Sequence, residues 1–375
     1  MVSTSELLID RARERTGLAD LGPDGWQEGL DRLLAAVPVD IGSDPRAAEA
    51  IETIILGRLV NRLRIEHWYA RHDEAEIPRV EGPVVILGLP RTGTTALHYL
   101  LAVDPRFRYL RAWESGDPVP PPVAATESDD PRRAAANGRG NVRHIKTVDG
   151  PVEDVGPLGL HFHNQDLLLP LPSYTRWWRD ADLTSTFAYH ERVLRLLHSH
   201  SASCRWLLKA PAYLFQVARL AERYPDVRFV MTHRDPAVAL ASACSTVASS
   251  QKGAVPARVQ DPRDLGRDLL EHFAEGTLRA IAERRRLGEE RFLDVGQHEI
   301  ENDPLGAAER IYDFLGLALT AQVRAAMAAW AAANRRGDRG RHVYAPEDFG
   351  LSAERIRRAF GGYIDRFGAL TGIAA

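Results

Sequence analysis

The stretch VVILGLPRTGTTALHYLLA, residues 84–102, decides the fold of this chain. Residues 84–87 form a short apolar, β-branched run after Gly82 and Pro83, which predicts a buried strand. From Thr94 onward, apolar residues recur at helical spacing. The turn between strand and helix contains glycine, so successive backbone N–H groups point toward the start of the helix. Such a turn binds phosphate, because unpaired amides and the helix dipole both favour an anion there.

The spacing Gly88-x-x-x-x-Gly93-Thr94-Thr95 is that of a nucleotide-triphosphate P-loop with one change. Thr94 stands where the P-loop has the lysine that reaches the terminal phosphates. A kinase or ATPase without that lysine lacks a main charge on the group being transferred. The loop is therefore expected to hold a phosphate while something else is transferred. The alternative is a glycine-rich turn without a ligand.

The composition excludes several classes of protein. The chain has 375 residues, 45% of them hydrophobic, with no apolar run of about 18 residues, which indicates a globular protein without a membrane span. The N-terminus has acidic residues and no apolar core, which argues against a secretory signal. Two separated cysteines, Cys204 and Cys244, fit a reduced cytoplasmic compartment and no zinc site. The net charge of −3 argues against general nucleic-acid binding.

Short apolar runs alternate with helical patterns along the rest of the chain. This alternation is typical of a parallel sheet, whose ligands bind at the carboxyl ends of the strands. The expected fold class is therefore α/β, with a P-loop-like parallel sheet flanked by helices. Strands are expected at 84–87, 205–209, 227–232 and 292–295, and helices at 213–223, 237–248 and 304–315; a second short run lies at 107–110.

Three segments are distinguished by their composition. Residues 1–80 have helical patterning and are expected to form a helical segment packed on the core, and residues 351–375 a C-terminal helix. Residues 81–350 make up the α/β domain. Within it, residues 115–180 contain several prolines and an acidic pair, which indicates a long insertion acting as a lid. The apolar and aromatic residues of this lid either cover an apolar acceptor or belong to the core; they are 167–169, Tyr174, Trp177 and Trp178.

Polar residues follow two of the predicted strands. Lys209 ends one strand, where it is either solvated or points into a cleft and stabilises charge on a leaving oxygen. Arg234 follows another strand, and Ser242 lies two turns into the next helix. An arginine and a serine placed in this way reach a second phosphate. The alternative is an arginine paired with Asp235 and a serine that packs between helices.

Three segments, GLPRTGTT, WLLKAP and HRDPAVALASACS, occur in this order and resemble the sulfotransferases that use 3′-phosphoadenosine 5′-phosphosulfate (PAPS). The resemblance is closest to the bacterial branch, which is also similar to the tyrosylprotein sulfotransferases. It runs from about residue 84 to residue 350. It implies transfer of a sulfuryl group from PAPS to a hydroxyl of a small acceptor, and the leucines and tryptophans of the lid favour a lipophilic one. The product of the donor is 3′,5′-adenosine bisphosphate, and no metal is required.

The resemblance also implies a donor site. The loop matches the one that holds the 5′-phosphosulfate, with Arg91 facing the sulfuryl group. Arg234 and Ser242 match the ligands of the 3′-phosphate, and the basic stretch 335–342 matches a strip that closes over it. The residues implied in donor binding are Arg91, Thr92, Gly93, Thr94, Thr95, Arg234, Ser242, Arg339 and Arg341.

Catalytic roles follow from the same resemblance. Lys209 matches the lysine that stabilises the bridging oxygen, and Glu114 matches the glutamate that is the general base in tyrosylprotein sulfotransferases. The family's histidines, two or four residues after the lysine, are replaced here by Pro211 and Tyr213. This replacement favours Glu114 as the base. A histidine of the lid is the alternative, and the nearest candidates are His161 and His163.

Two other classes of function are weighed. A P-loop-like small-molecule kinase needs a carboxylate for Mg²⁺, for which Asp294 is a weak candidate. A non-catalytic nucleotide-binding protein keeps the fold and lacks the base. The expected partner is a small hydroxyl acceptor, without nucleic acid, and the expected compartment is the cytoplasm. The oligomeric state does not follow from the sequence.

Overall fold

A parallel sheet forms the centre of the computed structural model, which describes residues 3–136, 147–201, 204–334 and 345–373. Within these residues the sheet has five strands in the order β2-β3-β1-β4-β5. This confirms the expected α/β class and the four predicted strand positions, and it shows that the short apolar run at 107–110 begins with a further strand. The strands are β1 Val84–Gly88, β2 Phe107–Arg108, β3 Arg205–Lys209, β4 Arg228–His233 and β5 Phe292–Gly296.

The register of the central strands brings three chain segments to one edge. β1 lies between β3 and β4, with Ile86 opposite Lys209 and Gly88 opposite Thr232. The carboxyl ends of all three strands therefore meet beside the loop that follows β1. β1 is buried at every position because helices cover both faces, and this is why its sequence is a continuous apolar run.

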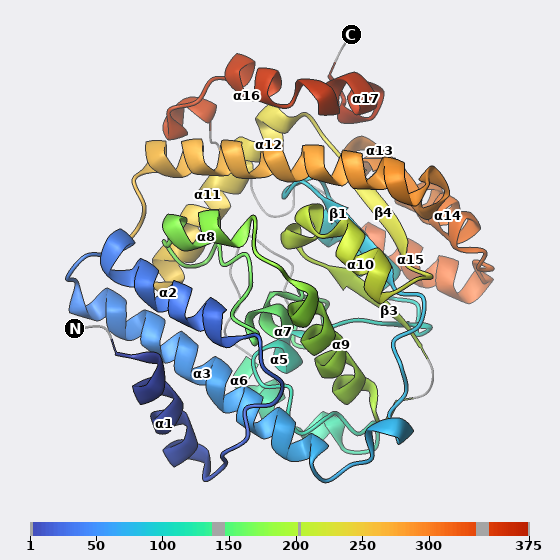
Figure 1. Ribbon diagram of the computed structural model, residues 1–375. Coiled ribbons are helices and arrows are strands. Elements are labelled where there is room, and N and C mark those ends of the chain that lie inside the picture. The colour runs from blue at the N-terminus through green and yellow to red at the C-terminus, as the bar shows by residue number, and fades with distance from the viewer. Residues whose placement is uncertain (1–2, 137–146, 202–203, 335–344, 374–375) are drawn as a thin grey trace.

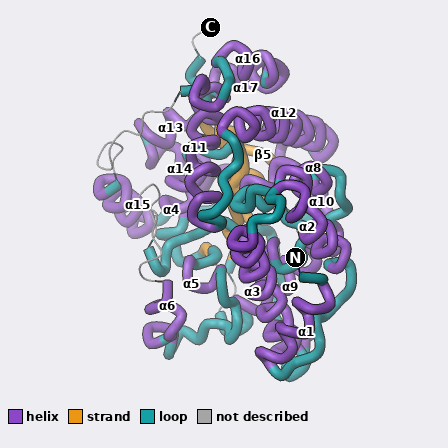
Figure 2. Tube along the Cα trace, turned by 90° about the vertical axis from the view of Figure 1, so that its left-hand side faces the viewer, coloured by secondary structure: helices purple, strands orange, loops and turns teal. Residues whose placement is uncertain are grey.

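Each face of the sheet has its own hydrophobic core. Val85 and Leu87 point into one core with α9 to α12 and the C-terminal helices, while Val84 and Ile86 point into the other with α4, α14 and α15. Figure 2 shows the strands between these two groups of helices. The helices are α4 Thr94–Leu101, α9 Thr184–His198, α10 Val217–Arg223, α11 Pro236–Ala254, α12 Pro262–Leu287, α13 Gln297–Asn302, α14 Pro304–Leu315 and α15 Ala321–Ala333.

The N-terminal helices pack on the predicted lid. A third hydrophobic cluster joins α1 to α3 with Phe162, Leu169 and Tyr174 of the segment 115–180. In Figure 1, α2 lies beside α8. The N-terminal helices thus share a hydrophobic core with the lid. These helices are α1 Ser5–Thr16, α2 Gln27–Asp40, α3 Pro45–Tyr69, α5 Ala112–Ser115, α6 Pro131–Ala136, α7 Val155–Gly159 and α8 Pro172–Trp178.

Two predicted helices are divided. The helix expected over 213–223 is replaced by a 3-10 turn, η3 Pro211–Phe215, followed by α10, because Gln216 leaves helical dihedral angles (φ −128°, ψ 20°). The C-terminal helix is two helices, which meet at Phe360 and pack beside α12 (Figure 1). They are α16 Ala353–Ala359 and α17 Gly361–Thr371; the other 3-10 turns are η1 Glu74–Glu76, η2 Glu127–Asp129, η4 Glu289–Arg291 and η5 Pro346–Phe349. None of the described helices is long and apolar enough to cross a bilayer.

Buried histidines make the fold sensitive to acid. His190 of α9 is fully buried, and neither ring nitrogen has a hydrogen-bond partner among the described residues. Burial lowers the pKa of His190 from 6.5 to about 3. Between these two values the unfolded chain binds a proton that the folded chain excludes, so stability is lost as the pH falls from 6.5 toward 3.

Replacement of His190 by leucine should weaken this pH dependence. We expect the free energy of unfolding of His190→Leu to fall less steeply below pH 6.5 than that of the wild type, by up to about 1.4 kcal/mol per pH unit. Urea unfolding at pH 7, 6 and 5 measures both slopes. The exposed His67 is the control, since His67→Leu should leave the slope unchanged. Equal slopes for His190→Leu and wild type would contradict the interpretation.

Candidate active site

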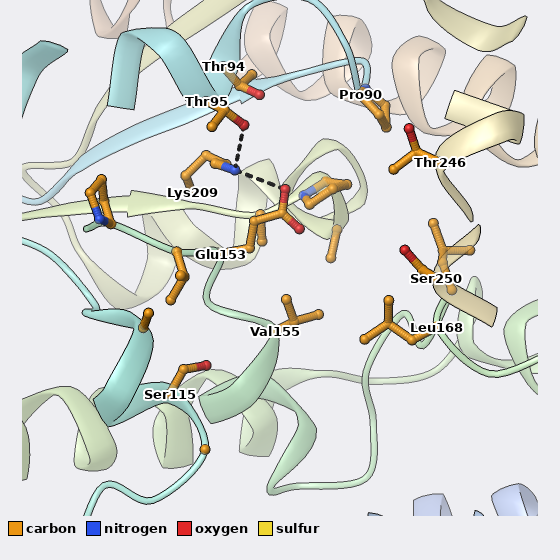
Figure 3. Close-up of a pocket in the computed structure, with 18 of the residues that line it drawn as sticks. Pro90, Thr94, Thr95, Ser115, Glu153, Val155, Leu168, Lys209, Thr246 and Ser250 are labelled. Atoms are coloured by element: carbon orange, nitrogen blue, oxygen red, sulfur yellow. Dashed lines mark hydrogen bonds and ion pairs between the residues drawn. The ribbon is translucent and has the colours of Figure 1, made fainter. Parts of the chain in front are cut away.

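A cavity of about 1020 Å³ opens at the carboxyl ends of β1 and β3. Its walls come from the loop after β1, from α11 and from the segment 112–168. In Figure 3, the side chains of the loop lie on one side of the cavity, and those of α5, α7 and the lid face them across it. The labelled residues on the two sides are Pro90, Thr94 and Thr95, and Ser115, Val155 and Leu168.

The backbone of the loop after β1 has positive φ angles at two glycines and one arginine. Gly88 has φ 146°, and a Cβ there would lie 2.6 Å from the carbonyl oxygen of Thr232, so only glycine fits. Gly93 has φ 94°, and Arg91 has φ 73°, which is rare for a residue with a side chain. Thr92 Oγ1 donates to Leu89 O at 2.6 Å, which fixes the loop internally.

The loop leads into α4 as the sequence predicts. No side chain of a described residue caps the first turn of α4, whose N-terminal neighbour is Gly93. The first amides of the helix therefore remain available to a ligand, and the dipole favours an anion at this position. The hydroxyls of Thr94 and Thr95 line the cavity next to these amides. This end of the cavity suits a phosphate.

Lys209 lies at the centre of the cavity. Its side chain is buried, with the residue 4% exposed, which excludes the solvated lysine that the sequence left open. Lys209 Nζ donates to Thr95 Oγ1 at 3.4 Å and to Glu153 Oε1 at 2.9 Å (Figure 3). The ammonium group thus connects the loop to a carboxylate of the lid.

Glu153 is a functional candidate that the sequence analysis missed. Its carboxylate lines the cavity, and 38% of the side chain is exposed. The signal in the sequence is an adjacent acidic pair, Glu153 and Asp154, within the lid. Acidic pairs are common in exposed loops, so the pattern by itself does not identify a site.

Asp154 anchors this part of the lid to the sheet. Its Oδ2 accepts hydrogen bonds from the backbone N–H of Lys209 at 2.7 Å and from the hydroxyl of Tyr213 at 2.8 Å. Its own N–H donates to Lys209 O at 3.0 Å. Burial raises the pKa of Asp154 to about 7, although both hydrogen bonds favour the ionised form. Tyr213 is fully buried. Its hydroxyl donates a hydrogen bond to Asp154, and the side chain does not line the cavity.

Glu114 is not brought to the cavity. The residue is 0% exposed, and its Oε1 accepts from Arg108 Nη2 at 2.6 Å and from Arg111 Nε at 2.9 Å. Its Oε2 accepts from the backbone N–H of Arg111 at 3.0 Å. The adjacent residues Trp113 and Ser115 line the cavity, whereas the carboxylate of Glu114 lies behind them.

The lid histidines and two of the lid aromatics also lie outside the cavity. His161 and His163 are buried, and burial lowers the pKa of His161 to about 3. Tyr174 and Trp178 are buried in the hydrophobic clusters, which decides between the two interpretations in favour of the core. In contrast, Leu167 and Leu168 do line the cavity.

The residues expected at a second phosphate lie close together beside the cavity, where Arg91 is in the lining and Arg234 and Ser242 are not. Arg234 Nη1 donates to the carbonyl oxygen of Arg91 at 3.0 Å, and Arg91 Nε donates to Ser242 Oγ at 3.0 Å. The alternative was that Arg234 pairs with Asp235. Asp235 is instead bonded to Arg357, and its side chain caps α11. Arg339 and Arg341 fall outside the described residues.

Comparison with known proteins decides the family. A model of the sulfotransferase family matches residues 83–321. This chain belongs to the sulfotransferase family. Its structure is similar to that of sulfotransferase STF9 from Mycobacterium avium, with 31% sequence identity, a TM-score of 0.88 and coverage of 98% of this chain and 97% of that one.

A second mycobacterial sulfotransferase is almost as similar. STF1 from Mycobacterium tuberculosis H37Rv has 30% identity and a TM-score of 0.84, with coverage of 96% of this chain and 99% of that one. A search of curated proteins finds no match. The family and the fold make this protein a transferase and support sulfuryl transfer as its reaction class.

Asp294, the candidate Mg²⁺ ligand of the kinase alternative, is engaged in an ion pair away from the cavity. Asp294 Oδ1 accepts from Arg284 Nη1 at 2.6 Å and is 2.8 Å from His233 Nε2. These partners lower the pKa of Asp294 to about 2, although burial opposes the shift. A carboxylate held between an arginine and a histidine is a structural ion pair. It does not line the cavity.

Loss of the Tyr213 hydroxyl should lower the free energy of unfolding more at pH 8.5 than at pH 5.5. The raised pKa of Asp154 means that stability is lost as the pH rises from 3.8 toward 7. Tyr213→Phe removes a hydrogen bond that favours the ionised carboxylate, so the pKa of Asp154 rises further and the loss extends to higher pH. Urea unfolding should show a cost of about 1 kcal/mol at pH 5.5 and about 2 kcal/mol at pH 8.5. A cost independent of pH would contradict this role, and Asp154→Asn should abolish the difference.

Proposed function

We propose that this protein transfers the sulfuryl group of PAPS to a hydroxyl of a small, lipophilic acceptor. The observation that carries the proposal is the position of Lys209, whose ammonium group contacts both Thr95 of the loop and Glu153 of the lid. One cavity thus holds a phosphate-binding loop, a buried cation and a carboxylate. Family membership supports the reaction class, and the remaining details rest on this geometry.

The residues present fit the donor. The loop residues 91–95 would hold the 5′-phosphate, since Gly88 and Gly93 let the backbone turn tightly toward α4. Arg234 and Ser242, both bonded to Arg91, would hold the 3′-phosphate together with Arg339 and Arg341. When bound, PAPS supplies a sulfuryl group activated by a phosphate leaving group.

Lys209 and Glu153 have different roles: Lys209 stabilises the leaving group, and Glu153 accepts a proton. The ammonium group of Lys209 stabilises negative charge that develops on the leaving oxygen, and Arg91 does so for the sulfuryl oxygens. Glu153 accepts the proton of the acceptor hydroxyl, because its carboxylate lines the cavity beside Lys209. This assignment takes the place of Glu114 and the lid histidines, which do not line the cavity. The backbone contacts between Asp154 and Lys209 keep Glu153 and Lys209 adjacent.

The side chains that line the cavity away from the loop indicate the chemical class of the acceptor. Away from the loop, the cavity is walled mainly by apolar side chains, which favour an apolar molecule through burial of its surface. Polar side chains also line this part of the cavity, among them Asp117, Arg132 and Gln165, so the preference for a lipophilic acceptor rests on the apolar side chains. The apolar residues are Trp113, Pro151, Val152, Val155, Leu167, Leu168, Pro211 and Ala212.

Binding of the nucleotide product tests the donor site first. We expect calorimetric titration with 3′,5′-adenosine bisphosphate to give micromolar affinity without metal, and ATP with Mg²⁺ to bind much more weakly. If ATP with Mg²⁺ bound and the bisphosphate did not, the proposed donor would be wrong. A kinase-like function would then be favoured.

The two cations should separate binding from catalysis. Lys209→Ala removes charge stabilisation from the leaving oxygen and should lower turnover by about a hundredfold or more, while the Kd for the bisphosphate changes only several-fold. Arg234→Ala should raise that Kd by about tenfold or more and affect turnover less. Calorimetry and initial rates of sulfuryl transfer measure the two effects. Equal losses of binding and turnover in each variant would show that these roles are misassigned.

Two isosteric glutamine variants identify the base. Glu153→Gln should lower kcat/KM by about 10² to 10⁴ and remove its fall at acidic pH, because the proton acceptor is lost. Glu114→Gln should keep that fall. The Kd for the bisphosphate controls for the integrity of the donor site in both variants. A profile that flattens only in Glu114→Gln would restore Glu114 as the base.

A further inference from the structure

Trp113 is a fixed aromatic wall of the cavity. It is the only aromatic side chain among the described residues that line the cavity, and it is 3% exposed. The guanidinium carbon of Arg111 lies 4.6 Å from the centre of its ring, and that of Arg132 lies 4.7 Å away. Its indole N–H donates to Asp149 Oδ1 at 3.2 Å. These contacts hold the indole in one orientation.

Glu114 holds the guanidinium group that packs on Trp113. Arg111 donates to Glu114 Oε1 through Nε at 2.9 Å and through Nη2 at 2.7 Å. The second cation on the same oxygen is Arg108. Because Glu114 is fully buried, removal of its charge leaves two cations without their common partner. The guanidinium of Arg111 would then keep its bond to Glu127 Oε2 at 2.9 Å, and loss of the Glu114 contacts would let it shift relative to the ring.

Residues of the lid also hold the indole. Asp149 is bonded to Arg133 Nη2 at 2.6 Å, and Arg132 Nη1 donates to the carbonyl oxygen of Asp117 at 2.8 Å. Trp113 is therefore fixed by residues before and after it in the chain. Ser115, two residues further on, lies in Figure 3 on the side of the cavity away from the loop. This is the end that the acceptor would occupy.

We propose that Trp113 determines which acceptors fit the cavity and that Glu114 is a positioning residue acting through Arg111. The inference rests on the proposed function, since it places the acceptor at this end. The other apolar side chains there are aliphatic and smaller, so the indole is the apolar side chain whose removal would enlarge this part of the cavity most. A rigid wall excludes large rings more sharply than a flexible one.

Binding of two phenols of different size tests the role of Trp113. Phenol and 2-naphthol are titrated separately into the protein saturated with 3′,5′-adenosine bisphosphate. Trp113→Ala should weaken phenol binding and strengthen 2-naphthol binding, so that the ratio of the two Kd values changes by about tenfold or more. Trp177→Ala is the matched control, because Trp177 belongs to the same lid but does not line the cavity. This control should leave the ratio unchanged.

Each other outcome overturns the inference. If Trp113→Ala changed both Kd values equally, Trp113 would not select by size. If the wild type bound the bisphosphate but neither phenol, the acceptor end would be wrongly assigned while the donor site stood. Failure of the bisphosphate itself to bind would instead refute the proposed function.

Glu114 is tested through the same ratio. Glu114→Gln should shift the phenol-to-naphthol ratio several-fold in the direction of Trp113→Ala, with an unchanged Kd for the bisphosphate and an unchanged pH profile of turnover. Arg111→Lys keeps the charge but loses the planar guanidinium group, and it should give the same shift if Glu114→Gln does not fold. An unchanged ratio in the folded variant would overturn the positioning role.

Discussion

The contact between Asp154 and the backbone of Lys209 is the constraint on which the site depends. Parallel strands bring the loop, Lys209 and Arg234 to one edge of the sheet, but they supply nothing on the acceptor side. Asp154 joins the lid to that edge through two backbone hydrogen bonds and one from Tyr213. The residue before it, Glu153, is thereby held against the ammonium group. A buried carboxylate is costly, and the pKa of about 7 reflects this cost.

Two glutamates near the cavity differ in role because their partners differ. Glu114 accepts three hydrogen bonds from Arg108 and Arg111 on one oxygen, and it is excluded from the cavity. Glu153 is partly exposed to the cavity and contacts Lys209. A carboxylate saturated by arginines is poorly suited to accept a proton, whereas it is well suited to fix the side chains around it. Glu153 is therefore the candidate for proton transfer, and Glu114 is the candidate for holding the surrounding side chains in place.

The cavity joins two chemically different surfaces. Near β1 the groups are backbone amides, hydroxyls and cations, which suit the phosphates of a nucleotide donor. Toward the lid, aliphatic side chains and one indole lie beside polar side chains such as Asp117, Arg132 and Gln165, and the apolar groups suit the apolar part of an acceptor. Lys209 and Glu153 lie between the two surfaces. This arrangement places the charge changes of transfer where the donor and acceptor ends meet.

The sequence by itself determined the sheet, the loop and the cations at the strand ends, because those features depend on local periodicity and on glycine. The strand at 84–87, the turn up to Gly93 and the place of Lys209 at a strand end follow from short patterns, whereas the burial of Lys209 became known only from the structure. The tertiary structure decided which carboxylate faces the cavity. Glu114 is enclosed by Arg108 and Arg111, which lie six and three positions before it, whereas Glu153 reaches Lys209 across 56 positions of the chain. Contacts between residues so far apart depend on how the lid folds back onto the sheet, and no short pattern in the chain specifies that path.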